Sequence, residues 1–294
     1  MAGQTKTILI TGGAGFIGSH LVERLVAAGH NVISLDNYFT GTKANHIDGA
    51  TYREGHTKDI ATHITEVPDI IYHLGEYSRV AKSFDEPEVV FDLNMDGTFA
   101  VLEFWRKHKC KLVYAGSSTK HADVREDGVS GRNLSPYTWA KAANSDLVAN
   151  YGRWNNLPYA ITYFYNVYGP RERGDGERGT FIEICKERYM QGAPHKIASP
   201  GTQTRAFTHV ADTVSGIVIA GEQTNSGEYG ISAKETYSLL DVANMFGGDI
   251  EMTPQTKSTR STGSVDTSGL EALGWKQQWT LPAYVEFIKQ ELRK

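Results

Sequence analysis

Over the first 165 residues, short apolar runs alternate with longer stretches in which apolar positions recur every three to four residues. The short runs are nearly continuously apolar, which predicts strands that are covered on both faces. These strands are expected at Thr7–Ile10, Asn31–Leu35, Ile70–Leu74, Lys111–Ala115 and Tyr159–Tyr163. The longer stretches predict helices at Gly15–Ala28, Glu88–Lys107 and Pro136–Asn155. This alternation is typical of an α/β fold, and we expect a doubly wound parallel sheet of the Rossmann type.

The rhythm changes after about residue 166, where a charged, glycine-rich loop precedes a predicted helix near Thr180–Gln191. Further elements without clear repeats are expected at Val210–Gly221, Ser238–Phe246 and Pro282–Leu292. No low-complexity linker separates the two halves of the chain. We therefore expect residues 1–165 and 166–294 to form two closely joined domains, with some interleaving of the chain. The second is expected to be a smaller α/β domain that packs over the carboxyl ends of the sheet.

Charge and composition narrow the classes of partner. The formal net charge is −4 and no basic stripe is present, which argues against binding to nucleic acid. No apolar stretch approaches the ~18 residues that a membrane span needs, and the polar start does not resemble a signal peptide. The ten histidines show none of the spacings of a metal site, so we expect no metal. We expect a soluble cytoplasmic protein.

Three glycines directly after the first predicted strand give the strongest local signal. Gly12, Gly15 and Gly18 lie at the start of a predicted helix, with Phe16 and Ile17 between the last two. Gly12 suits a tight turn, Gly15 permits a diphosphate to approach the backbone, and Gly18 permits close packing of helix and strand. The exposed N–H groups at the start of the helix favour an anion. This combination predicts a dinucleotide site.

An acidic residue at the end of the second predicted strand indicates which dinucleotide binds. Asp36 follows Gly18 by 18 positions, and Asn37 comes next. A carboxylate at this place accepts hydrogen bonds from ribose hydroxyls and repels a 2′-phosphate. No basic residue lies among residues 36–39. The sequence therefore predicts NAD rather than NADP as the cofactor.

A serine, a tyrosine and a lysine form the candidate catalytic set. Tyr137 and Lys141 are four positions apart on a predicted helix and therefore share one face. Ser117 follows a predicted strand, at the carboxyl edge where such sheets bind ligands. The lysine ammonium and the positive nicotinamide ring both favour the phenolate form of a tyrosine. Tyr137 could then remove a hydroxyl proton from a substrate, while Ser117 binds the same oxygen.

Several motifs together resemble the extended short-chain dehydrogenase/reductase family, also described as NAD-dependent epimerases and dehydratases. They are the glycine spacing of residues 12–18, Tyr137-Thr-Trp-Ala-Lys141, Tyr165-Asn-Val-Tyr-Gly-Pro-Arg171, Gly201-Thr-Gln-Thr-Arg-Ala-Phe-Thr-His-Val-Ala-Asp212 and Leu273-Gly-Trp275. The resemblance covers nearly the whole chain. It is strongest to the branch of UDP-glucose (UDP-galactose) 4-epimerases and related nucleotide-sugar epimerases.

The resemblance implies roles for further residues. Residues 1–165 would bind NAD and carry the catalytic set, and residues 166–294 would bind the nucleotide sugar. In addition to the glycine loop, Asp36 and the catalytic pair, the implied cofactor contacts are Asn37, Asp59, Ile60, Leu74, Gly75, Asn94 and Phe164. The implied substrate contacts are Ser118, Thr119, Asn166, Arg205 and Arg260. A homodimer through the helices near Glu88–Lys107 and Pro136–Asn155 is also implied.

The residues after Ser117 indicate which reaction to expect. In the resembled family, 4,6-dehydratases carry an Asp-Glu pair at the positions of Ser118 and Thr119, and glucuronate decarboxylases carry a glutamate at the second. Both positions hold hydroxyls here, which leaves oxidation and re-reduction at C4 of the sugar. The resemblance therefore implies a 4-epimerase of UDP-glucose, UDP-galactose or an N-acetyl or uronate analogue.

Two alternatives remain open at this point. One is a decarboxylase or 4,6-dehydratase that carries its extra acid elsewhere in the chain. The other is a non-catalytic NAD-binding sensor on the same fold, because fold alone does not establish activity. The presence of Ser117, Tyr137 and Lys141 argues against the sensor.

Overall fold

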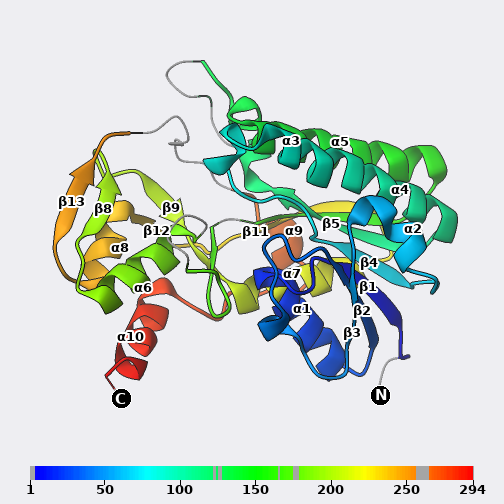
Figure 1. Ribbon diagram of the computed structural model, residues 1–294, viewed down its shortest axis with the longest axis horizontal. Helices are drawn as coiled ribbons and strands as arrows, with labels where there is room; N and C mark the ends of the chain where they lie inside the picture. The colour runs from blue at the N-terminus through cyan, green and yellow to red at the C-terminus, as the bar shows by residue number, and fades with distance from the viewer. Residues whose placement is uncertain are drawn as a thin grey trace.

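Seven parallel strands form the central sheet in the computed structural model, in the order β11-β6-β5-β4-β1-β2-β3 (Figure 1). The structure describes residues 4–121, 124, 128–164, 166–174, 179–255 and 265–293. The strands are β1 (Thr7–Thr11), β2 (Asn31–Asp36), β3 (Thr51–Glu54), β4 (Ile70–His73), β5 (Lys111–Ser117), β6 (Tyr159–Phe164) and β11 (Gly227–Ile231). The predicted α/β fold with a parallel Rossmann-type sheet is confirmed. β3 and β11 are strands of this sheet that the apolar pattern did not reveal.

Alternating side chains of the strands fill two separate apolar layers, one on each face of the sheet. Ile8 and Ile10 of β1 pack in one layer and Leu9 packs in the other. Both layers are buried, which explains why the strands are nearly continuously apolar.

Helices cover both faces of the sheet, as Figure 1 shows. One face carries α1 (Phe16–Ala27) and α7 (Val210–Glu222), and the opposite face carries α4 (Gly97–His108) and α5 (Pro136–Asn155). The short helices α2 (Ile60–His63), α3 (Pro87–Val90) and α9 (Ser268–Glu271) complete the layers. Among the described ranges, none of the helices is long and apolar enough to cross a membrane.

The helix expected at Glu88–Lys107 is in fact divided into three parts. α3 is followed by a π-helical turn at Phe91–Asp96, and α4 begins at Gly97. Asn94 lies in this wider turn, where its side chain accepts a hydrogen bond from the Tyr77 N–H at 2.6 Å and donates one to the Tyr77 carbonyl at 3.1 Å. The wide turn therefore holds the chain that follows β4. Such turns often lie at functional sites.

A smaller part of the molecule lies beside one end of the sheet (Figure 1). Its paired strands are β8 (His195–Ala198) with β13 (Ile250–Thr253), β9 (Thr204–Ala206) with β12 (Thr236–Ser238), and β7 (Val167–Tyr168) with β10 (Thr208–His209). Its helices are α6 (Phe181–Gln191), α8 (Leu239–Phe246) and α10 (Leu281–Glu291). Their inner faces share one apolar cluster that includes Ile182, Phe246 and Tyr284.

The second half of the chain also returns to the large sheet. β11 pairs with β6 over five residues, from Gly227 opposite Ala160 to Ile231 opposite Phe164. α7 packs Val214 and Ile217 into the same apolar layer as Ile10. The two halves of the chain therefore share one sheet and one core layer.

Candidate active site and cofactor cleft

A cavity of about 580 Å³ lies at the carboxyl ends of the parallel strands and extends to the smaller part of the molecule. It brings together many of the residues predicted from sequence. These are Gly12, Gly15, Phe16, Ile17, Gly18, Asp36, Asn37, Leu74, Gly75, Ser117, Ser118, Tyr137, Lys141, Phe164, Asn166 and Arg205. The position follows from the topology, because parallel strands all end at the same edge of the sheet.

The glycine loop leaves room that other residues would fill. Gly12 has a φ of +76°, in the region that favours glycine, and a Cβ there would lie 2.9 Å from backbone atoms of Gly75. A Cβ on Gly18 would lie 2.0 Å from the Gly12 carbonyl oxygen. α1 begins directly after Gly15, without a side-chain cap and without an acidic residue in its first turn. The loop thus presents open backbone and the positive end of a helix to the cavity.

Asp36 is held against the glycine loop by two backbone groups. Its carboxylate accepts hydrogen bonds from the Ala14 N–H at 2.9 Å and from the Tyr38 N–H at 2.8 Å. Burial raises the pKa of this carboxyl, and the two N–H groups oppose that effect. The oriented carboxylate at the end of β2 can accept hydrogen bonds from a ribose.

Ser117 ends β5 and is almost fully buried. Its hydroxyl shares a hydrogen bond of 2.8 Å with the hydroxyl of Thr119. Thr119 lies behind Ser117 and does not line the cavity, whereas Ser118 does. Thr119 therefore orients the serine hydroxyl, while Ser117 and Ser118 are accessible from the cavity.

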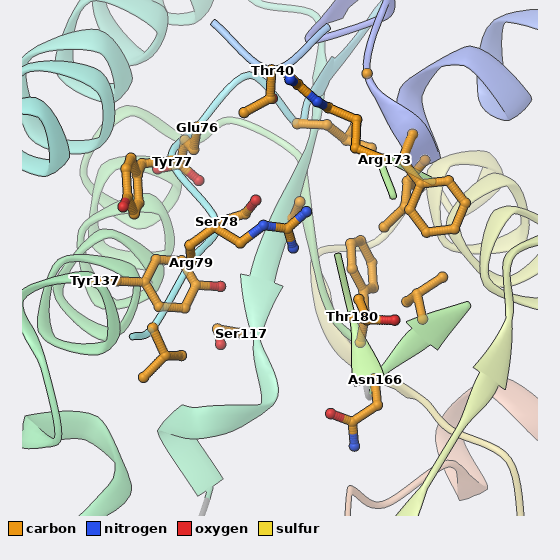
Figure 2. Close-up of a pocket in the computed structure, with 18 of the residues that line it drawn as sticks. Thr40, Glu76, Tyr77, Ser78, Arg79, Ser117, Tyr137, Asn166, Arg173 and Thr180 are labelled. Carbon is orange, nitrogen blue, oxygen red and sulfur yellow. The ribbon is translucent and has the colours of Figure 1, made fainter. Parts of the chain in front are cut away.

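Tyr137 and Lys141 enter the cavity from the start of α5. A capping box between Ser135 and Thr138, with Pro136 at the first helical position, fixes where this helix begins. The Lys141 ammonium donates to the Ala115 carbonyl and to the Glu76 carboxylate, and lies 4.6 Å from the centre of the Tyr114 ring. Tyr137 is half-buried and lies one turn before Lys141. Figure 2 shows Tyr137 and Ser117 on the same side of the cavity.

Glu76 is a residue of this site that the sequence analysis missed. It lines the cavity, yet its side chain is only 2% exposed because it faces Lys141. The available signal was an acidic residue two positions after the end of the predicted strand Ile70–Leu74, at the ligand-binding edge of the sheet. Nothing in the sequence indicated that it would meet Lys141, which is 65 positions away.

The opposite side of the cavity is formed by the smaller part of the molecule. Asn166 and Thr180 lie on this side in Figure 2. Asn166 donates to the Ala206 carbonyl at 2.9 Å, and Arg205 donates to the Thr204 carbonyl at 3.0 Å. Further basic residues that the sequence analysis did not assign to the site also line the cavity: Arg79, Lys82, Arg171 and Arg173. The cavity thus combines a glycine loop at one end with several basic groups, which suits an anionic ligand.

Some predicted contacts lie elsewhere. Asp59 is exposed at the start of α2, and Ile60 packs in the apolar layer beneath it. Asn94 does not line the cavity and instead holds the backbone of Tyr77. Arg260 lies outside the described residues. Within the described ranges, no group of three or more possible ligands gathers as a metal site would require.

The sequence profile of the NAD dependent epimerase/dehydratase family matches residues 8–233. The chain belongs to this family. NAD is therefore its cofactor, in agreement with the prediction from the glycine loop and Asp36. The residues present fit that cofactor: an open backbone cradle lies at Gly12–Gly18, and an oriented carboxylate lies at the end of β2.

Relatives in this epimerase/dehydratase family carry out more than one reaction. The UDP-N-acetyl-alpha-D-glucosaminuronate decarboxylase of Bacillus cytotoxicus is 30% identical over 264 residues, which cover 81% of this chain and 78% of that protein. The UDP-glucose 4-epimerase of Mycolicibacterium smegmatis is 29% identical over 296 residues, covering 93% and 94%. The solved structure of Thermus thermophilus UDP-glucose 4-epimerase with NAD is 25% identical, covers 98% of this chain and 99% of its own, and has a TM-score of 0.87. The protein is thus an NAD-dependent enzyme of nucleotide-sugar modification.

Proposed function

We propose that the protein is a 4-epimerase of nucleotide sugars, acting on UDP-glucose, UDP-galactose or an N-acetyl or uronate analogue. The supporting observation is that Ser117, Tyr137 and Lys141 meet in one cavity with the glycine loop, while Ser118 and Thr119 supply hydroxyls and no carboxylate beside Ser117. The epimerases among the relatives support a UDP-linked substrate.

Each residue of the catalytic set has a separate role in the proposed reaction. NAD, held at the glycine loop and Asp36, would supply the hydride acceptor for oxidation at C4 and the hydride donor for the re-reduction. Tyr137 takes the proton of the C4 hydroxyl and gives it back to the 4-keto oxygen at re-reduction. Ser117, oriented by Thr119, donates a hydrogen bond to the same oxygen. When the transient 4-keto sugar presents its other face between the two steps, the configuration at C4 is inverted.

Several groups would hold the substrate while this happens. Asn166 and Arg205 lie across the cavity from Tyr137, and a guanidinium is suited to a diphosphate because it donates two parallel hydrogen bonds. Phe164, at the end of β6, would lie against the nicotinamide. Arg260 remains a substrate contact proposed from its motif alone.

A homodimer is part of this proposal. The π-helical turn, α4 and α5 expose large aromatic side chains: Phe91 is 41%, Phe99 53% and Trp139 43% exposed. The rings of Phe91 and Trp139 lie 5.8 Å apart, so part of this apolar surface is continuous across two helices. Sedimentation of Phe99→Glu against the parent would test the contact, and an unchanged dimer would place the interface elsewhere.

Product analysis tests the reaction directly. The purified protein would be incubated with NAD and UDP-, GDP-, CDP- and dTDP-linked sugars, and the products followed by NMR. A C4 epimer of unchanged mass supports the proposal. Loss of carbon dioxide or water would instead show a decarboxylase or 4,6-dehydratase. Net production of NADH would show a dehydrogenase.

A matched pair of tyrosine variants tests the assigned base. Tyr137→Phe should keep NAD binding and lose turnover by roughly 10²–10⁴-fold, the usual contribution of a positioned acid–base group. Tyr151→Phe, on the same helix but bonded to Glu103 outside the cavity, should keep full turnover. Full turnover in Tyr137→Phe would remove Tyr137 from the mechanism.

A further inference from the structure

The Glu76 carboxylate occupies an unusual place beneath the catalytic pair. It is buried between β4, β5 and α5, and its Oε2 accepts from the Lys141 ammonium. A buried carboxylate is costly unless it is paired and hydrogen-bonded. Its presence at the cavity therefore calls for a physical reason.

Three neutral donors fix the other carboxylate oxygen. Oε1 accepts from the Thr98 hydroxyl at 2.7 Å, from the Asn144 amide at 2.9 Å and from the Tyr114 hydroxyl at 3.1 Å. These donors come from α4, α5 and β5. With this many contacts on Oε1, the carboxylate cannot swing toward a substrate, and only Oε2 is directed at Lys141.

The other ionisable groups around Glu76 are neutral at the pH of turnover. Burial lowers the pKa of His73, at the end of β4, to about 4. Burial and the nearby carboxylate raise the pKa of Tyr114 well above its usual value. Burial alone would raise the pKa of Glu76, but Lys141 and the hydrogen bonds outweigh it and lower the pKa. Lys141 is thus the cationic side chain that contacts Glu76, and Tyr137 lies one turn before it on α5.

We propose that Glu76 is the fixed counter-ion of Lys141, a positioning residue that keeps the ammonium protonated and in place on the face of α5 that also carries Tyr137. This inference rests on the proposed role of Tyr137 as the base. A desolvated lysine without a counter-ion loses its proton more readily, and the positive nicotinamide of NAD in the same cavity adds to that tendency. Glu76 compensates both effects. Since it touches neither the sugar nor the proton that moves, it acts through Lys141.

The isosteric variant Glu76→Gln removes the charge and keeps the size of the side chain. The negative charge beside Tyr137 and Lys141 is then absent, so the pair gives up its first proton at lower pH, and Lys141 competes with Tyr137 for that loss. We expect the acid limb of the kcat/KM profile to move to lower pH by about one unit or more, and the plateau to fall because part of the protein then carries a neutral Lys141 in place of the Tyr137 phenolate. Glu76→Asp keeps the charge at a greater distance and should give a smaller displacement in the same direction.

Tyr114→Phe is the matched control. It removes one neutral donor to the same carboxylate while keeping the ring beside Lys141, so the acid limb should stay where it is. If Glu76 had only a structural role, both variants would lower kcat at every pH without moving the limb. That result, or a displacement of the limb to higher pH in Glu76→Gln, overturns the proposal.

A spectroscopic titration separates this proposal from the proposed reaction. The ionisation of Tyr137 is followed by ultraviolet difference absorbance in the cofactor-free protein, with Tyr137→Phe as the reference. Glu76→Gln should move this titration to lower pH, because the negative charge that opposes the phenolate is gone. An unmoved titration rejects the counter-ion role even if the enzyme epimerises sugars. A moved titration supports the role even if no sugar is turned over. If Glu76→Gln does not fold, the same measurement is made on Glu76→Asp, with an intermediate displacement expected.

Discussion

On the sheet side of the cavity, polar side chains come from strand ends and from α5, and short hydrogen bonds hold each of them. Asp36 is held by two backbone N–H groups, Ser117 by Thr119, and Lys141 by Glu76 and the Ala115 carbonyl. On the opposite side, Asn166 and Arg205 come from loops and short strands and bond to the backbone of their own neighbourhood. The sheet-side groups are thus held by bonds within the sheet and α5, whereas the groups on the opposite side lie on loops and short strands, which vary more easily.

The relatives of this chain differ both in the sugar nucleotide and in the reaction that their names give. They include a UDP-glucose 4-epimerase and a UDP-N-acetyl-alpha-D-glucosaminuronate decarboxylase, and the NAD dependent epimerase/dehydratase family model matches this chain. Substitutions on the sheet side should therefore affect the cofactor and the reaction whatever the sugar. Substitutions on the opposite side should affect recognition of the sugar nucleotide and leave the affinity for NAD unchanged.

Gly18→Ala should have the largest effect, on the sheet side. The added methyl group would lie 2.0 Å from the Gly12 carbonyl oxygen, so the loop must move away from its cradle shape. Because a displacement of about 1 Å can reduce turnover on the order of 100-fold, we expect at least that loss together with weak NAD binding. Isothermal titration with NAD and steady-state rates measure both. Gly269→Ala in α9 is the control, since no atom lies within 4 Å of the added carbon. Normal NAD affinity in Gly18→Ala would contradict the assigned cradle.

Arg205→Ala should give an intermediate effect, on the opposite side. Hydrogen bonds to charged groups contribute about 1.5–3 kcal/mol, which corresponds to a rise in KM for the nucleotide sugar of roughly tenfold or more. Arg205→Lys keeps the charge but loses the planar guanidinium with its two parallel donors. Its KM should therefore lie between that of the parent and that of Arg205→Ala. NAD affinity should be unchanged in both variants. A parallel loss of NAD affinity would show that the two sides of the cavity are not separable in this way.

Mild acid should have the smallest effect, a decrease in the free energy of unfolding. This decrease has a contribution from one histidine on each side of the cavity. Burial lowers the pKa of both His73, on the sheet side, and His209, beside the smaller part, to about 4. The unfolded chain binds these protons first as the pH falls below about 6.5, so stability decreases between pH 6.5 and 4. For each histidine we expect a loss of about 2 kcal/mol between pH 6.5 and 5.

His209→Asn isolates the second of these contributions. An asparagine can still cap α7, as the His209 ring does by accepting from the Ala211 N–H, but it does not titrate. Denaturant unfolding at the two pH values should show an acid-induced loss of stability about 2 kcal/mol smaller than that of the parent. An unchanged sensitivity would mean that His209 is not neutral in the folded protein.

The local pattern predicted the sheet side of the fold well. The bounds of α5 agree with the prediction because Pro136 and Ser135 mark the helix start within the sequence itself. The glycine loop was equally predictable from the sequence, since all of its parts lie within seven consecutive residues. Strands of the large sheet that are apolar on both faces, such as β1 and β5, were found for the same reason.

Features that join distant segments could not be predicted in this way. The contact of Glu76 with Lys141 depends on how β4 and α5 meet in space. β8 and β13 pair across more than fifty residues, and neither has a strongly apolar pattern. The apolar spacing around Asn94 predicted a uniform helix, but the structure has a π-helical turn there. The turn places the Asn94 side chain to bond the backbone of Tyr77, a contact that the apolar spacing does not encode.

The return of the chain to the large sheet has a consequence for any attempt to cut the protein in two. A fragment that ends at residue 165 would lack β11, so β6 would carry a row of unpaired backbone groups along its whole length. It would also lack α7, which leaves Ile10 and Val113 without the cover of Val214 and Ile217. Exposed strand edges of this kind attract other chains. A segment from the second half of the chain, residues 210–231, thus shields the first half from self-association.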